Sequence, residues 1–274
     1  MSAPSRDAPA ERLARAFERP TLVAYLVGGH PSPEAFLAHA SAVVRGGAGV
    51  LEIGIPFSDP IADGPTIQAA ATAALAAGVT PKDVLGLAGR VHEAHPDVPL
   101  VLMTYANLPS RMGLEAFRDA ALAAGVCGVI LPDVPLEEAP PFQEALAPLA
   151  LVLLASPASD ADRLARLAAA TRGFLYAVGR FGVTGARSGL AEETLATTRR
   201  VAAAARAADV PLAVGFGVAR PEDASALVAA GADGVVVGSA FVQRVLDGVP
   251  PSGSEALARE LAGAVRAAGA RRNG

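Results

Sequence analysis

The chain has 274 residues, of which 52% are hydrophobic and only 4% aromatic, with 28 glycines and 22 prolines. This length matches one α/β barrel, which typically takes about 250 residues, better than it matches two ordinary domains. A formal net charge of −4 without a Lys/Arg cluster argues against nucleic acid or an anionic membrane as a general partner. The single cysteine, Cys127, excludes a disulfide framework and a cysteine metal site.

The N-terminal segment from Met1 to Arg19 is polar and charged throughout. We therefore expect no signal peptide or membrane span there, and a cytoplasmic location for the protein. Residues 1–10 are expected to form a flexible extension, and a short helix near residues 10–17 is expected to cap the bottom of a barrel. No linker or low-complexity stretch divides the chain, which predicts a single domain over residues 1–274.

Short runs rich in Val, Leu and Ile recur about every 25 to 35 residues, and each precedes an Ala/Leu-rich segment with helical spacing. A doubly wound open sheet usually has fewer strands and a glycine-rich turn after the first, whereas here the glycine-rich turns follow the last three runs. The repeat therefore favours a single (β/α)₈ TIM barrel. Its eight strands are predicted at residues 22–27, 50–53, 100–104, 128–131, 151–154, 174–178, 212–215 and 234–237.

Two carboxylates near the second predicted strand are candidates for proton transfer. Glu52 lies among aliphatic residues, so a barrel strand would place it in an apolar interior, where desolvation raises the pKa of a carboxyl group. The alternative for Glu52 is a buried ion pair, although no Arg or Lys is adjacent. Asp63 precedes Gly-Pro, which is typical of a turn or a helix cap, but its loop is long for a βα connection and suits a lid.

Glycine-rich loops follow the last three predicted strands at residues 182–185, 215–217 and 238–239. Glycine lets backbone N–H groups approach an anion, and a helix that begins at Ser239 would add its N-terminus and a hydroxyl. Barrels of this class often bind phosphate after their seventh and eighth strands. The three loops together predict a phosphate site, although each alone is equally typical of a tight turn.

The sequence also limits the chemistry. The only lysine, Lys82, falls at a predicted helix start, which argues against a Schiff-base aldolase. Only His30 among the four histidines follows a strand, so we expect no metal site. No dinucleotide fingerprint is present. The residues alone therefore indicate acid–base lysis or isomerisation of a phosphorylated small molecule.

The segment from Leu51 to Gln68 closely resembles the signature of tryptophan synthase α chains. Further blocks agree in order along nearly the whole barrel, at residues 105–107, 132–135, 182–185 and 215–217. The resemblance implies a lyase of tryptophan biosynthesis that splits indole-3-glycerol phosphate into indole and glyceraldehyde 3-phosphate. Two departures, Gly-Gly-His-Pro at residues 28–31 and Gly179-Arg180 where the family often has Ser-Arg, affect only the expected loop packing and partner contacts.

The resemblance also implies roles for particular residues. Glu52 and Asp63 become the catalytic pair, and Tyr176 helps to place Glu52. Thr184 is implied to be a lid residue that meets Asp63 on closure. Tyr105 and Phe216 are expected to sandwich the indole, and the phosphate is expected at Gly185, Gly217, Gly238 and Ser239.

The resemblance further implies a partner. We expect a β subunit that carries pyridoxal phosphate, in an α2β2 heterotetramer, with no cofactor or metal in this chain. Two alternatives share the same barrel: a freestanding lyase that releases indole, and a catalytically silent barrel that activates its partner. The presence of both carboxylates argues against the silent barrel. The sequence does not separate an α chain that works with a β subunit from a freestanding lyase, because both need the same active-site residues.

Overall fold

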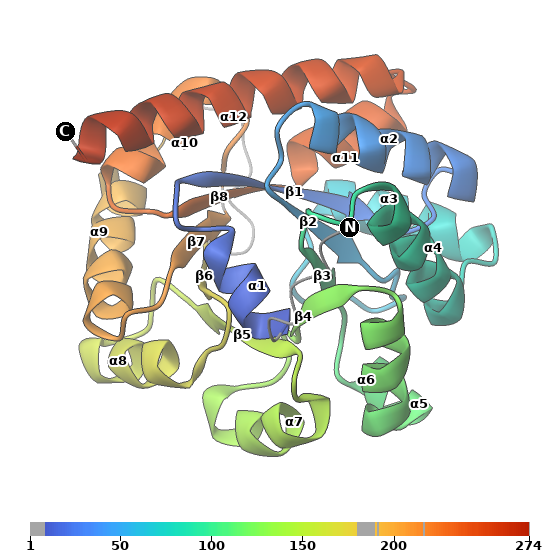
Figure 1. Ribbon diagram of the computed structural model, residues 1–274, viewed down its shortest axis with the longest axis horizontal. Helices are drawn as coiled ribbons and strands as arrows, with labels where there is room; N and C mark the ends of the chain where they lie inside the picture. The colour runs from blue at the N-terminus through green and yellow to red at the C-terminus, as the bar shows by residue number, and fades with distance from the viewer. Residues whose placement is uncertain (1–8, 180–189, 191, 216, 274) are drawn as a thin grey trace, which may run out of the picture.

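The computed structural model describes residues 9–179, 190, 192–215 and 217–273. Eight parallel strands close a barrel in chain order, and the helices surround it (Figure 1). The predicted TIM barrel is thus confirmed. The strands are β1 (Thr21–Val27), β2 (Val50–Gly54), β3 (Leu100–Met103), β4 (Val126–Ile130), β5 (Ala150–Ala155), β6 (Leu175–Val178), β7 (Leu212–Gly215) and β8 (Gly234–Val237).

The helices lie between the strands or at the ends of the chain. In Figure 1 the long C-terminal helix α12 runs alongside α2 and α10. The helices are α1 (Pro9–Arg15), α2 (Pro33–Arg45), α3 (Pro65–Ala76), α4 (Pro81–Ala94), α5 (Asn107–Met112), α6 (Leu114–Ala123), η1 (Leu136–Glu138), α7 (Ala139–Leu146), α8 (Ala161–Ala170), α9 (Glu192–Ala207), α10 (Pro221–Ala229), α11 (Ser239–Leu246) and α12 (Pro251–Asn273).

Each predicted apolar run overlaps one strand, with ends that differ from the prediction by no more than two residues, as is usual for element boundaries. Local capping fixes several helix starts. The side chains of Ser32, Thr80 and Asp160 accept the backbone N–H groups that open α2, α4 and α8. Each cap fixes the residue at which its helix begins, and therefore the residue at which the preceding loop ends.

Side chains alternate between two apolar layers along each strand. Val23, Val101 and Val152 point into the barrel and pack together there. Leu22, Leu51 and Leu102 belong to the layer between the strands and the surrounding helices. This period of two decides which strand residues reach the interior, and it places Glu52 on the same face as Val50.

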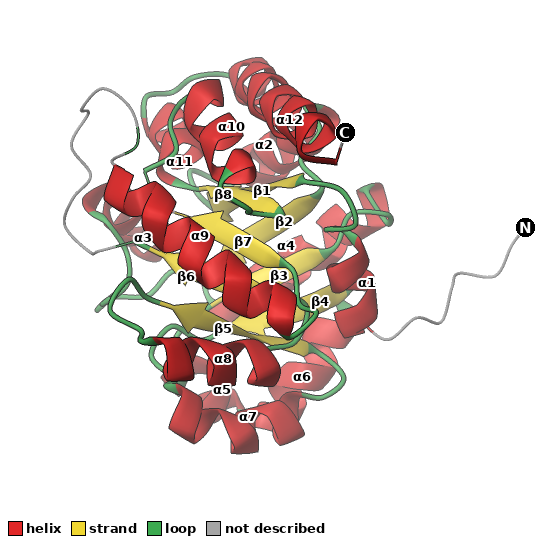
Figure 2. Cartoon of the chain, turned by 90° about the vertical axis from the view of Figure 1, so that its left-hand side faces the viewer, coloured by secondary structure: helices red, strands yellow, loops and turns green. Residues whose placement is uncertain are grey.

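Helix α1 closes the bottom of the barrel, as the sequence predicts (Figure 2). Leu13 fills the space beside Gly128 and Gly173, and Phe17 fills the space beside Gly234, so closely that a methyl group on any of these glycines would collide with it. The interior is therefore blocked at this end. Residues 1–8 lie outside the described residues, and the single domain with an N-terminal extension stays a prediction.

Within the described ranges, no helix is both long enough and apolar enough to cross a bilayer.

Candidate active site

Glu52 lies in the middle of β2 with its side chain inside the barrel, and only 1% of the residue is exposed. Its Oε2 atom has no hydrogen-bond partner, and no ion pair reaches the carboxylate among the described residues. Burial, followed by the nearby charge of Asp63, raises the pKa of Glu52 from 4.5 to about 8. The apolar setting predicted for Glu52 is confirmed, and Glu52 forms no buried ion pair with any of the described residues.

Asp63 lies in the loop between β2 and α3 and is held at the mouth of the barrel by Tyr105. The Tyr105 hydroxyl donates to Asp63 Oδ2 at 3.4 Å and accepts the backbone N–H of Ala62 at 2.9 Å. Gln68 donates to the backbone carbonyl of Asp63 at 2.8 Å. Burial raises the pKa of Asp63 above its ordinary value, although the hydrogen bond from Tyr105 lowers it in part. The long loop therefore brings a second carboxylate to Glu52.

Two more tyrosines are buried beside the carboxylates. Tyr176 on β6 is 7% exposed, and burial followed by the charges of Glu52 and Asp63 raises its pKa well above 10. Its hydroxyl lies against Gly215, where an added Cβ would come within 2.5 Å of the oxygen. Tyr25 on β1 has a similarly raised pKa, because of burial and then the charges of Asp63 and Glu52. Both phenols therefore stay protonated at neutral pH.

An aromatic pair lies beside Asp63. The rings of Phe57 and Tyr105 are stacked, with their centroids 4.8 Å apart. Phe57 belongs to the loop after β2 and Tyr105 follows β3, so the pair joins two neighbouring loops and offers a flat apolar surface. Phe216, the other expected contact for an indole ring, lies outside the described residues.

The expected phosphate site is described only in part. Gly238 and Ser239 lie where α11 begins, so the helix N-terminus faces the carboxyl end of β8 as predicted. Gly217 has a φ of +70°, a conformation that favours glycine, and it follows β7. Thr184 and Gly185 lie outside the described residues. The described part of the cradle, Gly217, Gly238 and Ser239, is thus compatible with an anion through backbone N–H groups and one hydroxyl.

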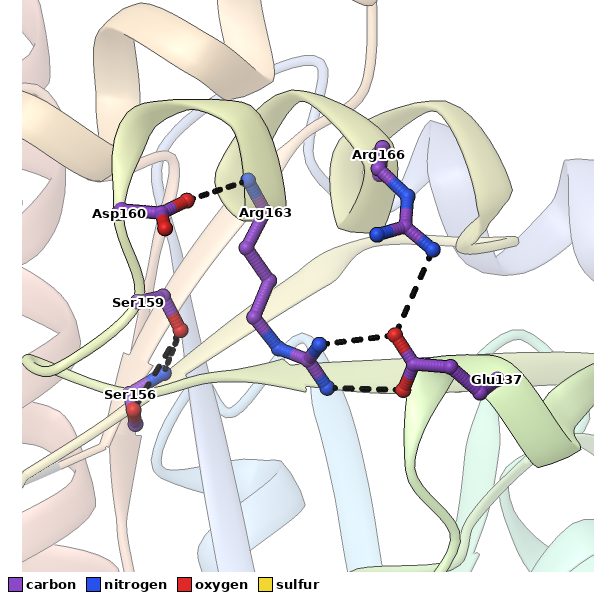
Figure 3. A network of polar contacts seen from close by, with 6 residues as sticks. All are labelled: Glu137, Ser156, Ser159, Asp160, Arg163 and Arg166. Carbon is purple, nitrogen blue, oxygen red and sulfur yellow. Dashed lines mark hydrogen bonds and ion pairs between the residues drawn. The ribbon is translucent and has the colours of Figure 1, made fainter.

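Polar contacts join the segments that follow β3, β4 and β5. Asp133 accepts the backbone N–H of Ala106 through both carboxylate oxygens, at 3.0 and 3.1 Å, next to Tyr105. Figure 3 shows Arg163 of α8 reaching Glu137 of η1 with two hydrogen bonds of 2.9 and 3.1 Å, beside Arg166. Exposed ion pairs of this kind add little stability, because water and salt screen the charges. Their effect here is to join the segments that follow β4 and β5.

Among the described residues, no group of three or more His, Cys, Asp or Glu side chains is placed to hold a metal ion. Lys82 is the second residue of α4, as the sequence predicts, at a helix start and not on a barrel strand.

Comparison with known proteins identifies the family. The sequence model described as "Tryptophan synthase alpha chain" matches residues 12–267. The tryptophan synthase α chain of Halobacterium salinarum is 46% identical over 270 residues, which cover 94% of this chain and 95% of that protein. The α chain of Natronomonas pharaonis is 43% identical over 265 residues, with 91% and 93% covered. A structure of Mycobacterium tuberculosis tryptophan synthase superimposes with a TM-score of 0.82 at 38% identity, covering 96% of this chain and 98% of that chain.

The chain belongs to the tryptophan synthase α chain family. It is therefore a lyase of tryptophan biosynthesis, and the reaction of its family is the cleavage of indole-3-glycerol phosphate. A freestanding lyase and a silent barrel are not favoured. In this α chain, Glu52 and Asp63 lie close to each other, and their charges act on the two tyrosines singled out by the sequence: both carboxylates on Tyr176, and Asp63 on Tyr105.

Two residues of the α chain site were not predicted from the sequence. Phe57 lies inside the signature segment, but its contact with Tyr105 depends on how two loops meet. Tyr25 carried a usable signal, because a single phenol inside an aliphatic strand stands out in the same way as Glu52 does. In the register of β1 and β2, Tyr25 is the direct partner of Glu52.

Proposed function

We propose that Glu52 and Asp63 are the catalytic pair with which this α chain splits indole-3-glycerol phosphate into indole and glyceraldehyde 3-phosphate. The burial of Glu52 carries the proposal. With a pKa of about 8, the carboxyl group keeps its proton at neutral pH, although an ordinary glutamate has lost it. A proton donor close to Asp63, in an apolar interior, suits the first step of the cleavage.

The bond between indole C3 and the glycerol chain breaks only if the ring can accept the bonding electrons. Glu52 donates its proton to C3, which converts the ring to an indolenine-like form. The Asp63 carboxylate accepts a hydrogen bond from the ring N–H and stabilises the positive charge that develops on the nitrogen. The Glu52 carboxylate then accepts the proton of the hydroxyl on the neighbouring carbon, the C–C bond breaks, and the aldehyde leaves. Glu52 ends the cycle protonated, so the protons balance.

The other proposed residues bind and orient the substrate. Tyr176 helps to place Glu52, and Tyr105 packs against the indole with Phe216. Thr184 closes over the site and meets Asp63. The phosphate is proposed at Gly185, Gly217, Gly238 and Ser239, where the start of α11 supplies N–H groups.

We also propose that the α chain acts with a β subunit, in an α2β2 heterotetramer in the cytoplasm, which passes indole to a pyridoxal phosphate site in the β chain. Indole is small and apolar and escapes from water into membranes, so direct transfer prevents its loss. Ile61 supports this proposal, because 69% of this large apolar residue is exposed in the loop that holds Asp63. An exposed apolar side chain beside the site suits an interface with another chain.

The test combines two measurements on the intact chain. Glu52→Gln keeps the shape of the side chain and removes its ionisable proton, so indole formation should be abolished while the fold remains. Comparable turnover by this variant would refute the role of Glu52. Titration of the unaltered chain with a β chain from the same organism should raise the rate of cleavage, because docking orders the loops around the site. Full activity alone, unchanged by the β chain, would refute the paired function.

A further inference from the structure

Tyr25 lies inside the barrel at the level of the carboxylates. It is 5% exposed and shares a face of β1 with Val23, which packs in the barrel interior. Its ring contacts an apolar cluster from α3 and α11 that includes Ala70 and Val242. Since α3 follows the loop of Asp63 and α11 begins at Ser239, Tyr25 occupies the position between the proposed catalytic pair and the proposed phosphate site.

Close contacts with two glycines locate the side chain more sharply. A Cβ added to Gly54, at the end of β2, would come within 2.1 Å of the Tyr25 hydroxyl oxygen. A Cβ added to Gly238, just after β8, would come within 3.4 Å of the ring. Strand β1 pairs with β2 on one side and with β8 on the other. The phenol therefore lies between the strand of Glu52 and the strand that leads to the phosphate cradle.

Glu52 Oε2 is buried without a hydrogen-bond partner, and a buried polar atom of this kind calls for a ligand as its partner. Tyr25 is the strand neighbour of Glu52, and no hydrogen bond within the described residues acts on its phenol, so its hydroxyl is free to donate to the same ligand. This step rests on the proposed function. In indole-3-glycerol phosphate the ring N–H is assigned to Asp63 and the phosphate to the cradle. The two hydroxyls of the glycerol chain are the polar groups that remain.

We propose that Tyr25 recognises the glycerol chain of the substrate, its hydroxyl donating a hydrogen bond to a glycerol hydroxyl oxygen as the chain passes over β1 from the indole to the phosphate. The phenol acts as a donor and not as a base, because its proton is retained at neutral pH. It fixes the chain so that the hydroxyl next to the breaking bond faces Glu52. Tyr25 is thus a specificity residue for the hydroxylated chain, in addition to its packing role.

The experiment compares two ligands that differ only in the chain. Indole-3-glycerol phosphate carries both hydroxyls, and indole-3-propanol phosphate carries neither. Calorimetric dissociation constants are measured for both in the Glu52→Gln background, which prevents turnover, with and without Tyr25→Phe. Loss of one hydrogen bond should weaken the glycerol ligand roughly 3- to 10-fold. Affinity for the propanol ligand should change less than about twofold, because Phe preserves the ring and its packing.

The propanol phosphate ligand is the matched control in both chains, because it meets the same ring but has no hydroxyl to accept the hydrogen bond. The ratio of the two affinities therefore isolates the bond from Tyr25. Equal weakening of both ligands by Tyr25→Phe, or no weakening of either, would overturn the role of Tyr25 alone. Failure of the glycerol ligand to bind when Tyr25 is present would overturn the proposed function, and the role of Tyr25 with it.

Discussion

The proton on Glu52 should be visible as a pH dependence of stability that Glu52→Gln removes. The pKa of Glu52 is about 8 in the folded chain against 4.5 when the group is unperturbed. Between these values the folded state binds the proton and the unfolded state releases it, so the free energy of unfolding falls as pH rises. The slope reaches about 1.4 kcal/mol per pH unit, which amounts to about 3 kcal/mol between pH 4.5 and pH 7.

Urea unfolding followed by circular dichroism at several pH values from 5 to 8.5 measures this slope. The difference between the unaltered chain and Glu52→Gln isolates the contribution of this one group. Glu137→Gln is the control, because the hydrogen bonds from Arg163 lower the pKa of Glu137 and so move its titration below this pH range. Equal slopes in the unaltered chain and in Glu52→Gln would show that the carboxyl group does not hold a proton at neutral pH.

Four further predictions concern the site. The kcat/KM of the cleavage should fall as pH rises through about 8, when Glu52 loses its proton, and a flat profile from pH 6 to 9 would contradict this. It should also fall in acid, at a pH above the ordinary aspartate value of 3.8, because burial raises the pKa of Asp63. Asp63→Asn should lower kcat by about 100-fold or more with a smaller change in KM, and a loss confined to KM would make Asp63 a binding residue. The same variant should move the alkaline fall of kcat/KM to lower pH, because the charge that helps to raise the pKa of Glu52 is gone. Tyr105→Phe removes the hydrogen bonds to Ala62 and Asp63, so kcat/KM should fall roughly 3- to 10-fold for each bond lost, and unchanged kinetics would mean that the loop is held by other contacts. In crystals grown with inorganic phosphate, the ion should lie at Gly217, Gly238 and Ser239, and consistent binding elsewhere with this cradle empty would count against the assigned site.

Much of the fold follows from the sequence, because the barrel depends on a repeated local pattern. Strands such as β5 and β8 are continuous apolar runs, which is the pattern expected of a parallel strand that is buried on both faces. The apolar setting of Glu52 follows from its strand for the same reason. The position of Asp63 is harder to predict from the sequence, because its approach to Glu52 depends on the path of a long loop and on the hydroxyl of Tyr105.

The contacts that the sequence did not predict are those made between separate strands and loops. Whether the Tyr25 hydroxyl meets Gly54 depends on the register of β1 against β2, which the pattern of each strand alone does not specify. The stacking of Phe57 on Tyr105 likewise depends on two loops that fold over the same opening. Local sequence thus locates the catalytic candidates, whereas their supporting residues are found only in three dimensions.

The helix at the bottom of the barrel has a consequence for chemistry at the other end. Leu13 and Phe17 fill the gaps that glycines leave in the barrel wall, and Phe17, Phe174 and Tyr176 follow one another with ring centroids 5.0 and 6.0 Å apart. If water entered from below, the surroundings of Glu52 would become more polar and its pKa would fall toward 4.5. The acid would then be ionised before it met its substrate. Variants of α1 that lose activity should therefore be tested for the pKa of Glu52 before the loss is attributed to misfolding.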